Sequence, residues 1–305
     1  MKKTGLVIVA TLILGCSPGW AQDKKAPLIL EPSSPWNVDY AADFCRLART
    51  FGTGDEKTSL LIDRFAPGDL FRMTLVGEVT NAAKGGGRAR IRFGTDAPEQ
   101  EAHFFSGSWT GNIPAWIFTT GTRIRPRTEA EQALIDRAAK RSGDRMDIPG
   151  ISEAEEAAVT EVHFGRPLRQ PLVLRTGSMQ APFAAMRTCT DELLTHWGID
   201  VTRHREQSEP ATPITPPGRW LTDQDYPALM QEEGQPGLVN FRLTVGEDGR
   251  AKSCHIQQST NPKGFDDAVC RALIRSARFT PAKDKDGKPL VSYYLNSVRF
   301  MFPRM

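Results

Sequence analysis

The sequence predicts an α+β protein of two domains, and three patterns along its 305 residues carry this prediction. Residues Leu238 to Val245 alternate between apolar and polar side chains, which is the period of a half-buried β-strand. Between Phe265 and Leu273 apolar residues recur at helical spacing and form one stripe. Four prolines fall within residues 206–219, which we expect to be a partly polyproline II linker between an amino-terminal domain, 35–205, and a carboxy-terminal domain, 220–305.

The beginning of the chain has the features of an export signal. Lys2 and Lys3 precede an apolar run from Leu6 to Leu14. This run is too short to span a bilayer, because a membrane-crossing helix needs about 20 residues. A small residue at Ala21 suits cleavage by a signal peptidase. We therefore expect residues 1–21 to be a signal peptide and the mature protein to be periplasmic.

Two alternatives to conventional cleavage stay open. Residues Leu12 to Cys16 also fit a bacterial lipobox, in which Cys16 would carry the lipid. The signal would otherwise be retained as a membrane anchor. Mass spectrometry of the mature amino terminus separates the three cases, because the first residue would be Gln22, lipidated Cys16 or Met1. After conventional cleavage, residues 22–34 are expected to form a polar tail.

The amino-terminal domain contains short alternating runs that indicate antiparallel strands in a mixed α+β fold. We expect strands within residues 38–51, 59–65, 70–77, 89–93, 109–119, 161–164 and 172–175. Two capping boxes, Thr128 with Glu131 and Ser152 with Glu155, begin short helices. A longer helix with an apolar stripe opens at Pro182. No pattern in this domain points to a particular activity.

The carboxy-terminal domain continues with elements that suit a compact sheet and helix. A turn at residues 247–249 leads into a second, weaker strand at 250–258. The helix that follows is stopped by Pro281. A last long strand covers Leu290 to Phe302 and is closed by Pro303.

Several short motifs in this domain stand in the order and at the spacings of one known family. They are Tyr226-Pro227-Ala228, Gly237-Leu238-Val239, Val245 with Asp248-Gly249-Arg250, Ser259, Phe265-Asp266, Arg278-Phe279-Thr280-Pro281-Ala282, Gly287-Lys288-Pro289 and Val298-Arg299-Phe300. Residues 220–303 thus resemble the C-terminal domain of TonB-family energy transducers. The resemblance implies a three-stranded antiparallel sheet packed with one or two helices. One departure is Ser259-Thr260-Asn261-Pro262, where relatives often carry Ser-Ser-Gly after the second strand.

Four cysteines remain besides Cys16, and they permit three pairings. Packing the helix on the second strand would bring Cys254 to Cys270, and relatives of TonB-like domains often carry cysteines at these two places. That pairing leaves Cys45 with Cys189. Free buried thiols are the alternative, which the export signal disfavours. No two cysteines have C-x-x-C spacing, so we expect no metal site.

Composition and motifs argue against other classes of protein. The formal net charge of +3, without a Lys/Arg-rich run, gives no support for nucleic-acid binding. None of the five histidines has His-x-x-x-His or His-Glu-x-x-His spacing, and there is no Gly-x-Ser-x-Gly elbow. We therefore expect no catalytic residues, no metal and no cofactor. An enzyme or ligand-binding amino-terminal domain with a TonB-like docking module stays open as an alternative.

The resemblance implies a mode of binding as well as a fold. TonB-like domains capture a short extended segment of an outer-membrane TonB-dependent transporter by adding it to a sheet edge. Carried onto this chain, the edge lies in residues 291–302. The side chains expected at a docked peptide are Val291, Tyr293, Tyr294, Asn296, Val298, Arg299 and Met301. The pattern is equally consistent with one of the two tyrosines lying in the core and the other covering the sheet.

The departures from a working transducer shape the functional expectation. Such a transducer has a membrane anchor and a long Pro-rich arm, whereas this chain has a cleavable signal and a folded domain in place of the arm. We therefore expect a periplasmic adaptor that binds transporter segments. The alternative is a membrane-anchored energy transducer that supports transmembrane transport. The same edge would also allow two copies to pair by strand exchange.

Overall fold

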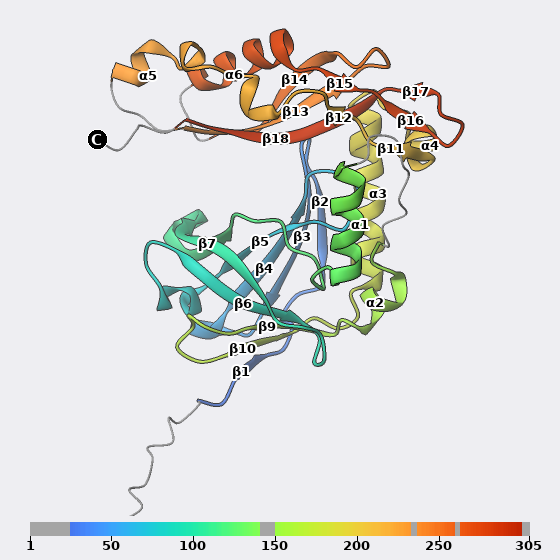
Figure 1. The fold of residues 1–305 in the computed structure, drawn as a ribbon. Coiled ribbons are helices and arrows are strands. Elements are labelled where there is room, and N and C mark those ends of the chain that lie inside the picture. The colour runs from blue at the N-terminus through green and yellow to red at the C-terminus, as the bar shows by residue number, and fades with distance from the viewer. Residues whose placement is uncertain (1–24, 141–149, 233–236, 260–262, 301–305) are drawn as a thin grey trace, which may run out of the picture.

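The computed structural model describes residues 25–140, 150–232, 237–259 and 263–300, which form two domains (Figure 1). A large sheet with helices against it makes the amino-terminal domain, and a small sheet covered by one helix makes the carboxy-terminal domain. The α+β prediction is confirmed. The predicted signal peptide, with Cys16, and the predicted site residue Met301 lie outside the described residues.

The amino-terminal sheet has ten strands in the order β1-β10-β9-β6-β7-β8-β5-β4-β3-β2. They are β1 (Leu28–Leu30), β2 (Asn37–Tyr40), β3 (Cys45–Phe51), β4 (Thr58–Arg64), β5 (Arg72–Val76), β6 (Gly87–Phe93), β7 (Gln100–Trp109), β8 (Ile113–Phe118), β9 (Glu161–Phe164) and β10 (Leu172–Arg175). Neighbouring strands are antiparallel except for β1, which runs parallel to β10. The many short antiparallel strands agree with the sequence pattern.

A helix packs against this sheet and closes its core. It is α3 (Gln180–His196), which carries α2 (Glu153–Ala158) and the short α4 (Val201–Arg205) against it; α1 (Glu129–Lys140) follows β8 in the chain. Both predicted capping boxes are present, with Thr128 and Ser152 each accepting a backbone N–H of the first turn. The apolar stripe of α3 is buried at Phe183 and Leu193. Helix α3 therefore positions the end of the domain that faces the carboxy-terminal sheet (Figure 1).

Three details of this domain refine the expectation or differ from it. Residues 22–34 are not wholly a tail, because Leu28–Leu30 pair with β10 and Leu30 is buried. A run of three apolar residues is too short to show a period, so the sequence pattern does not predict this strand. Residues 38–51, within which strand was expected, hold two strands that pair with each other, and Cys45 begins the second. Strand β7 was not expected as a whole, because Gly107 and two serines interrupt its alternation.

The expected polyproline linker is instead docked on the carboxy-terminal domain. Its residues Gln207–Glu209 form β11, which pairs with β16 (Ala282–Asp284). Residues Thr212–Pro213 form β12, which pairs with β15 (Phe279–Thr280). The prolines remove only their own N–H groups, so the residues between them remain free to pair along a sheet edge.

The carboxy-terminal domain is a three-stranded antiparallel sheet of order β14-β13-β18 under helix α6. The elements are α5 (Ala228–Glu232), β13 (Gly237–Val245), β14 (Ala251–Ser259), α6 (Lys263–Ser276), β17 (Pro289–Leu290) and β18 (Ser292–Phe300). The alternate residues Val239, Phe241, Leu243 and Val245 of β13 are buried with the apolar stripe of α6. The expected three-stranded sheet with its helix is therefore present.

The sheet face opposite α6 lies against the amino-terminal domain (Figure 1). The Asp43 carboxylate, in the turn between β2 and β3, lies 2.6 Å from His255 Nε2 on β14. The Arg242 guanidinium on β13 lies 4.0 Å from the centre of the Trp197 ring at the end of α3. The Trp197 ring also meets Tyr293 of β18 at 5.4 Å. The amino-terminal domain thus covers one face of the small sheet.

Candidate functional site: the open edge of the carboxy-terminal sheet

Strand β18 is an edge of the carboxy-terminal sheet and pairs on one side with β13. Nine consecutive residue pairs, from Gly237 with Phe300 to Val245 with Ser292, join the two strands without a register shift. Along the described residues no strand pairs with the other side of β18. An edge of this kind presents backbone N–H and C=O groups that can accept another strand.

The register assigns the predicted site residues to two faces. Residues opposite each other in a ladder point to the same face, so Tyr294, Asn296 and Val298 lie on the α6 side with Leu243, Phe241 and Val239. Tyr293 and Arg299 lie on the face toward the amino-terminal domain. Val291 was expected on the pairing edge, but it falls in the break between β17 and β18 and is not part of the ladder.

The two adjacent tyrosines have different roles in packing. Tyr294 belongs to the core side, where its ring contacts Trp220 and Phe279 at 5.5 and 5.1 Å. Tyr293 covers the other face and stacks on His204 at 5.5 Å. Burial raises the pKa of the Tyr293 phenol to about 12, so this group stays neutral over the physiological range.

A side chain of β18 caps one backbone N–H of the same strand. The Ser297 N–H donates to Asn296 Oδ1 at 2.8 Å, and Asn296 Nδ2 donates to Tyr294 Oη at 2.8 Å. Because β13 occupies the other side, this bond places the Ser297 N–H on the open side of β18. Backbone direction alternates along a strand, so Leu295 and Arg299 also present their N–H and C=O groups there.

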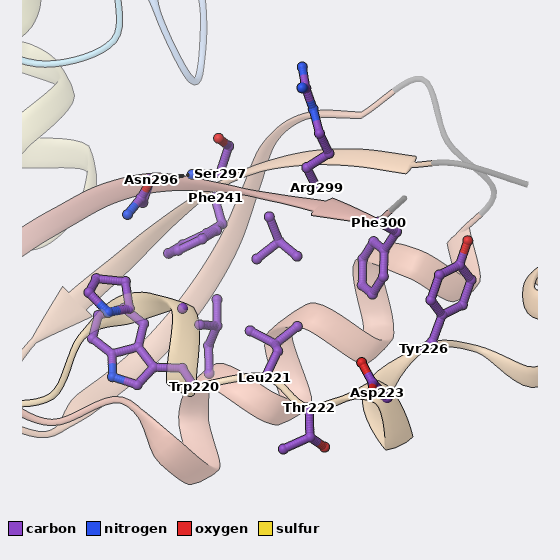
Figure 2. A pocket seen from close by; sticks show the side chains of 14 residues that line it. Trp220, Leu221, Thr222, Asp223, Tyr226, Phe241, Asn296, Ser297, Arg299 and Phe300 are labelled. Carbon is purple, nitrogen blue, oxygen red and sulfur yellow. Dashed lines mark hydrogen bonds between the residues drawn. The ribbon is translucent and has the colours of Figure 1, made fainter. Parts of the chain in front are cut away.

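A groove lies beside the open edge on the α6 side (Figure 2). Its volume is about 390 Å³, and residues 296–300 of β18 form one wall. Trp220, Leu221 and Thr222 form the facing wall, and Tyr226 and Phe300 lie together at one end (Figure 2). The floor is apolar, with Phe241, Leu273 and Val298. Alternate side chains of a strand added to β18 would point into this groove.

Local hydrogen bonds hold the facing wall, which the sequence analysis did not identify. Asp225 accepts from the Thr222 N–H at 2.9 Å and from Arg275 Nη2 at 2.8 Å. The hydrogen bond from Arg275, helped by those from Thr222, lowers the pKa of the Asp225 carboxyl. The Trp220 indole N–H donates to Thr215 Oγ1 at 2.9 Å. The Thr222-x-x-Asp225 spacing is the one signal that the sequence offered for this wall.

The opposite edge of the sheet, β14, is irregular. The register between β13 and β14 shifts twice, so that Lys252 and Gln257 are extra residues relative to β13. The Lys252 ammonium is held by Asp248 at 2.6 Å. A disulfide joins Cys254 of β14 to Cys270 of α6, with 5.4 Å between the Cα atoms. Bulges and charges of this kind discourage the pairing of an edge with another chain.

The second disulfide ties the amino-terminal domain together. Cys45 at the start of β3 is bonded to Cys189 of α3, with 5.9 Å between the Cα atoms. Both disulfides are the pairs expected from the sequence. Because α3 carries Trp197 at its end, the Cys45–Cys189 bond also helps to hold the contact between the two domains.

One histidine and one carboxylate of the amino-terminal sheet form a small cluster with two arginines. The buried Glu161 carboxylate accepts from His163 Nε2 at 2.5 Å and also contacts Arg175. The Arg92 guanidinium lies 3.1 Å from His163 Nδ1. Both ring nitrogens therefore have partners, so this imidazole links β6 to β9. Within the described residues no group of three or more His, Cys, Asp or Glu could hold a metal ion.

Residues 222–302 match the family model of the Gram-negative bacterial TonB protein C-terminal domain. The matched span contains the open edge and most of the groove, and it confirms the resemblance found in the sequence. Domains of this family are non-catalytic, are associated with transport and belong to the Gram-negative envelope. No curated protein matches the chain. Within the part of the chain that the structure describes, no helix is long and apolar enough to cross a membrane.

Proposed function

We propose that this protein is a periplasmic adaptor that binds an extended segment of an envelope partner by adding it as a strand to β18. The partner class is an outer-membrane TonB-dependent transporter, in line with the family match of residues 222–302. The observation that carries the proposal is the regular, unpaired edge of β18 next to an apolar groove. Backbone pairing supplies affinity in this mode, and side-chain pockets supply selectivity.

The outward backbone groups of β18 give the binding its energy. Each hydrogen bond exchanged between water and an added strand contributes about 0.5–1.5 kcal/mol net. The groove adds apolar burial, at about 25 cal/mol for each Å² removed from water. A segment that is disordered before binding loses conformational entropy, which offsets part of both terms. The expected affinity is therefore moderate, as suits a contact that must form and release.

Proline at Ser297 tests the strand-addition mechanism. Proline lacks the N–H, and its ring blocks close approach on that side of the strand. The Ser297 N–H points away from β13, so the β13–β18 ladder should survive, as edge strands tolerate proline in this orientation. We expect Ser297→Pro to weaken binding of transporter amino-terminal peptides by about ten-fold or more. Isothermal titration calorimetry measures the affinity.

Ser297→Ala is the matched control, because it removes the hydroxyl and keeps the N–H. Its affinity should stay close to that of the unaltered protein. Amide chemical shifts of β13 report whether the sheet is intact in both variants. Equal binding by the proline and alanine variants would exclude addition to the β18 edge.

A further inference from the structure

A second cleft reaches the open edge from the face toward the amino-terminal domain. It has a volume of about 190 Å³ and is lined by residues of both domains. Asn240, Gln257 and residues 295–297 come from the carboxy-terminal sheet, whereas Phe65 and Arg72 come from the amino-terminal domain. Asn296 and Ser297 line this cleft and also the groove on the α6 side. The same point of β18 is therefore flanked on both faces.

Specific contacts hold the amino-terminal wall in place. Besides the Asp43–His255 pair, the Gln257 amide nitrogen lies 3.5 Å from the Asp43 backbone oxygen. Arg203 of α4 donates to the Pro289 backbone oxygen at 2.9 Å and lies 3.3 Å from Asp284. These contacts come from both ends of the interface. The position of Phe65 and Arg72 beside β18 is thus fixed by the fold.

The Arg72 guanidinium has an aromatic neighbour but no hydrogen-bonded carboxylate. It lies 4.9 Å from the centre of the Phe65 ring. Asp63 lies opposite Arg72 on the neighbouring strand β4. Its carboxylate accepts two hydrogen bonds from Arg46, at 2.6 and 2.8 Å. Among the described side chains none accepts a hydrogen bond from Arg72. Partial burial lowers the pKa of Arg72 but leaves the group charged.

Charge on this face favours an acidic ligand. Arg299 of β18 is exposed and points away from the α6-side groove, toward the same face as Ser297 (Figure 2). Two guanidinium groups therefore border the edge on this side. A planar guanidinium beside an aromatic ring suits a carboxylate ligand, to which it can donate two hydrogen bonds.

We propose that the amino-terminal domain forms the second wall of the strand-binding site, and that Arg72 binds an acidic side chain of the docked strand. This inference rests on the proposed function. Side chains of an added strand alternate between the groove and the cleft, so only positions of one parity can reach Arg72. The amino-terminal domain then selects among partners, while β18 supplies the backbone pairing that all of them share.

The test uses the full-length mature protein and paired peptides. The probes are synthetic twelve-residue peptides from the amino termini of TonB-dependent transporters encoded in the same genome. Each is also made with its Asp and Glu residues replaced one at a time by Asn and Gln. We expect that replacing the acidic residue at one position of the peptide by its amide weakens binding by about ten-fold. Replacements at the other positions should leave the affinity unchanged.

Variants of Arg72 assign that preference to the amino-terminal wall. Arg72→Gln should bind the acid and amide peptides equally, at the affinity that the unaltered protein has for the amide. Arg72→Lys keeps the charge without the planar fork and should retain part of the preference. Arg88→Gln is the matched control, because Arg88 is an exposed arginine on β6 that pairs with Glu101, and it should keep the full preference. Thermal unfolding followed by circular dichroism checks that each variant is folded.

Two results would contradict the inference, and they are distinguishable. An undiminished acid preference in Arg72→Gln excludes Arg72 as the residue that binds the acidic side chain. If Arg299→Gln also loses the preference, the recognition lies in the carboxy-terminal domain alone. Failure of the unaltered protein to bind any peptide refutes strand addition itself and this inference with it.

Discussion

The two edges of the carboxy-terminal sheet are built in opposite ways. Strand β14 has two register shifts, a paired lysine and a disulfide to α6. Strand β18 has nine regular pairs with β13, no shift, and a groove along its open side. Both edges belong to one sheet and differ only in how they are protected. The comparison shows that a regular edge is specific to β18 and is not a general property of the strands in this small sheet.

The physical reason for this asymmetry is the risk that any free edge carries. An unprotected strand pairs with whatever extended chain it meets, including another copy of the same protein. Bulges break the regular spacing of donors and acceptors, and charges oppose burial. With β14 protected, β18 is the regular free edge of this small sheet within the described residues. Under the proposed function, the two walls beside β18 restrict which chains can reach it.

The largest expected effect concerns the protected edge. The Cys254–Cys270 disulfide closes a loop of 16 residues in the unfolded chain and so lowers the entropy of that state. Without it, the free energy of unfolding should fall by about 3 kcal/mol. Peptide affinity should stay within about two-fold, because β18 is held by β13 and not by this bond. Urea denaturation and calorimetry on Cys254→Ala/Cys270→Ala measure the two quantities. A parallel loss of affinity would show that the two edges are coupled.

A smaller effect concerns the wall that distinguishes β18 from β14. Hydrogen bonds from Arg275 and Thr222 lower the pKa of Asp225 in the folded protein. Its stabilising contribution is therefore present above its ordinary pKa near 3.8 and is lost as the pH falls through the lowered folded value. Asp225→Asn keeps an oxygen that can accept from the Thr222 N–H but removes the charge that pairs with Arg275. It should cost about 1 kcal/mol of stability or less at neutral pH, the usual range for an ion pair with one exposed partner. It should also flatten the pH dependence of stability below about pH 4.

Asp223 provides the control for this experiment. It lies in the same turn and lines the groove, but the hydrogen bonds of the cap go to Asp225. Asp223→Asn should leave the stability at neutral pH nearly unchanged, as followed by denaturant titration. Equal losses in the two variants would mean that general surface charge, and not the cap, holds the wall.

The carboxy-terminal fold could be predicted because its local patterns agree with its packing. The alternation within β13 runs from Leu238 to Val245, and Val239, Phe241, Leu243 and Val245 are buried under α6. The strand and helix that carry Cys254 and Cys270 lie against each other, so their pairing followed from the elements and the resemblance. The edge position of the last strand was implied by the resemblance alone, and β18 does lie at an edge, whereas the partner that adds to it stays a prediction.

The walls of the site could not be predicted, because they depend on contacts between distant residues. Nothing in the sequence around Arg72 shows that it lies beside Ser297. The sequence also has no signal that residues 207–213 pair with strands about 70 residues later in the chain. The prolines in this segment suggested an extended linker. Tertiary pairing decided both cases over local propensity.

The smallest expected effect concerns the one internal cap on the open edge. The Asn296 side chain accepts from the Ser297 N–H, so a docked strand must displace it to form a regular ladder. Water replaces this bond in Asn296→Ala, which makes the net gain on removing the competitor only about two- to three-fold in peptide affinity. Fluorescence anisotropy with a labelled peptide resolves a change of this size. Asn296→Asp keeps an acceptor at the same place and should show no gain. Weaker binding by the alanine variant would instead mean that the Asn296 amide contacts the partner. The side chain would then add to the binding at the β18 edge and would not compete with it.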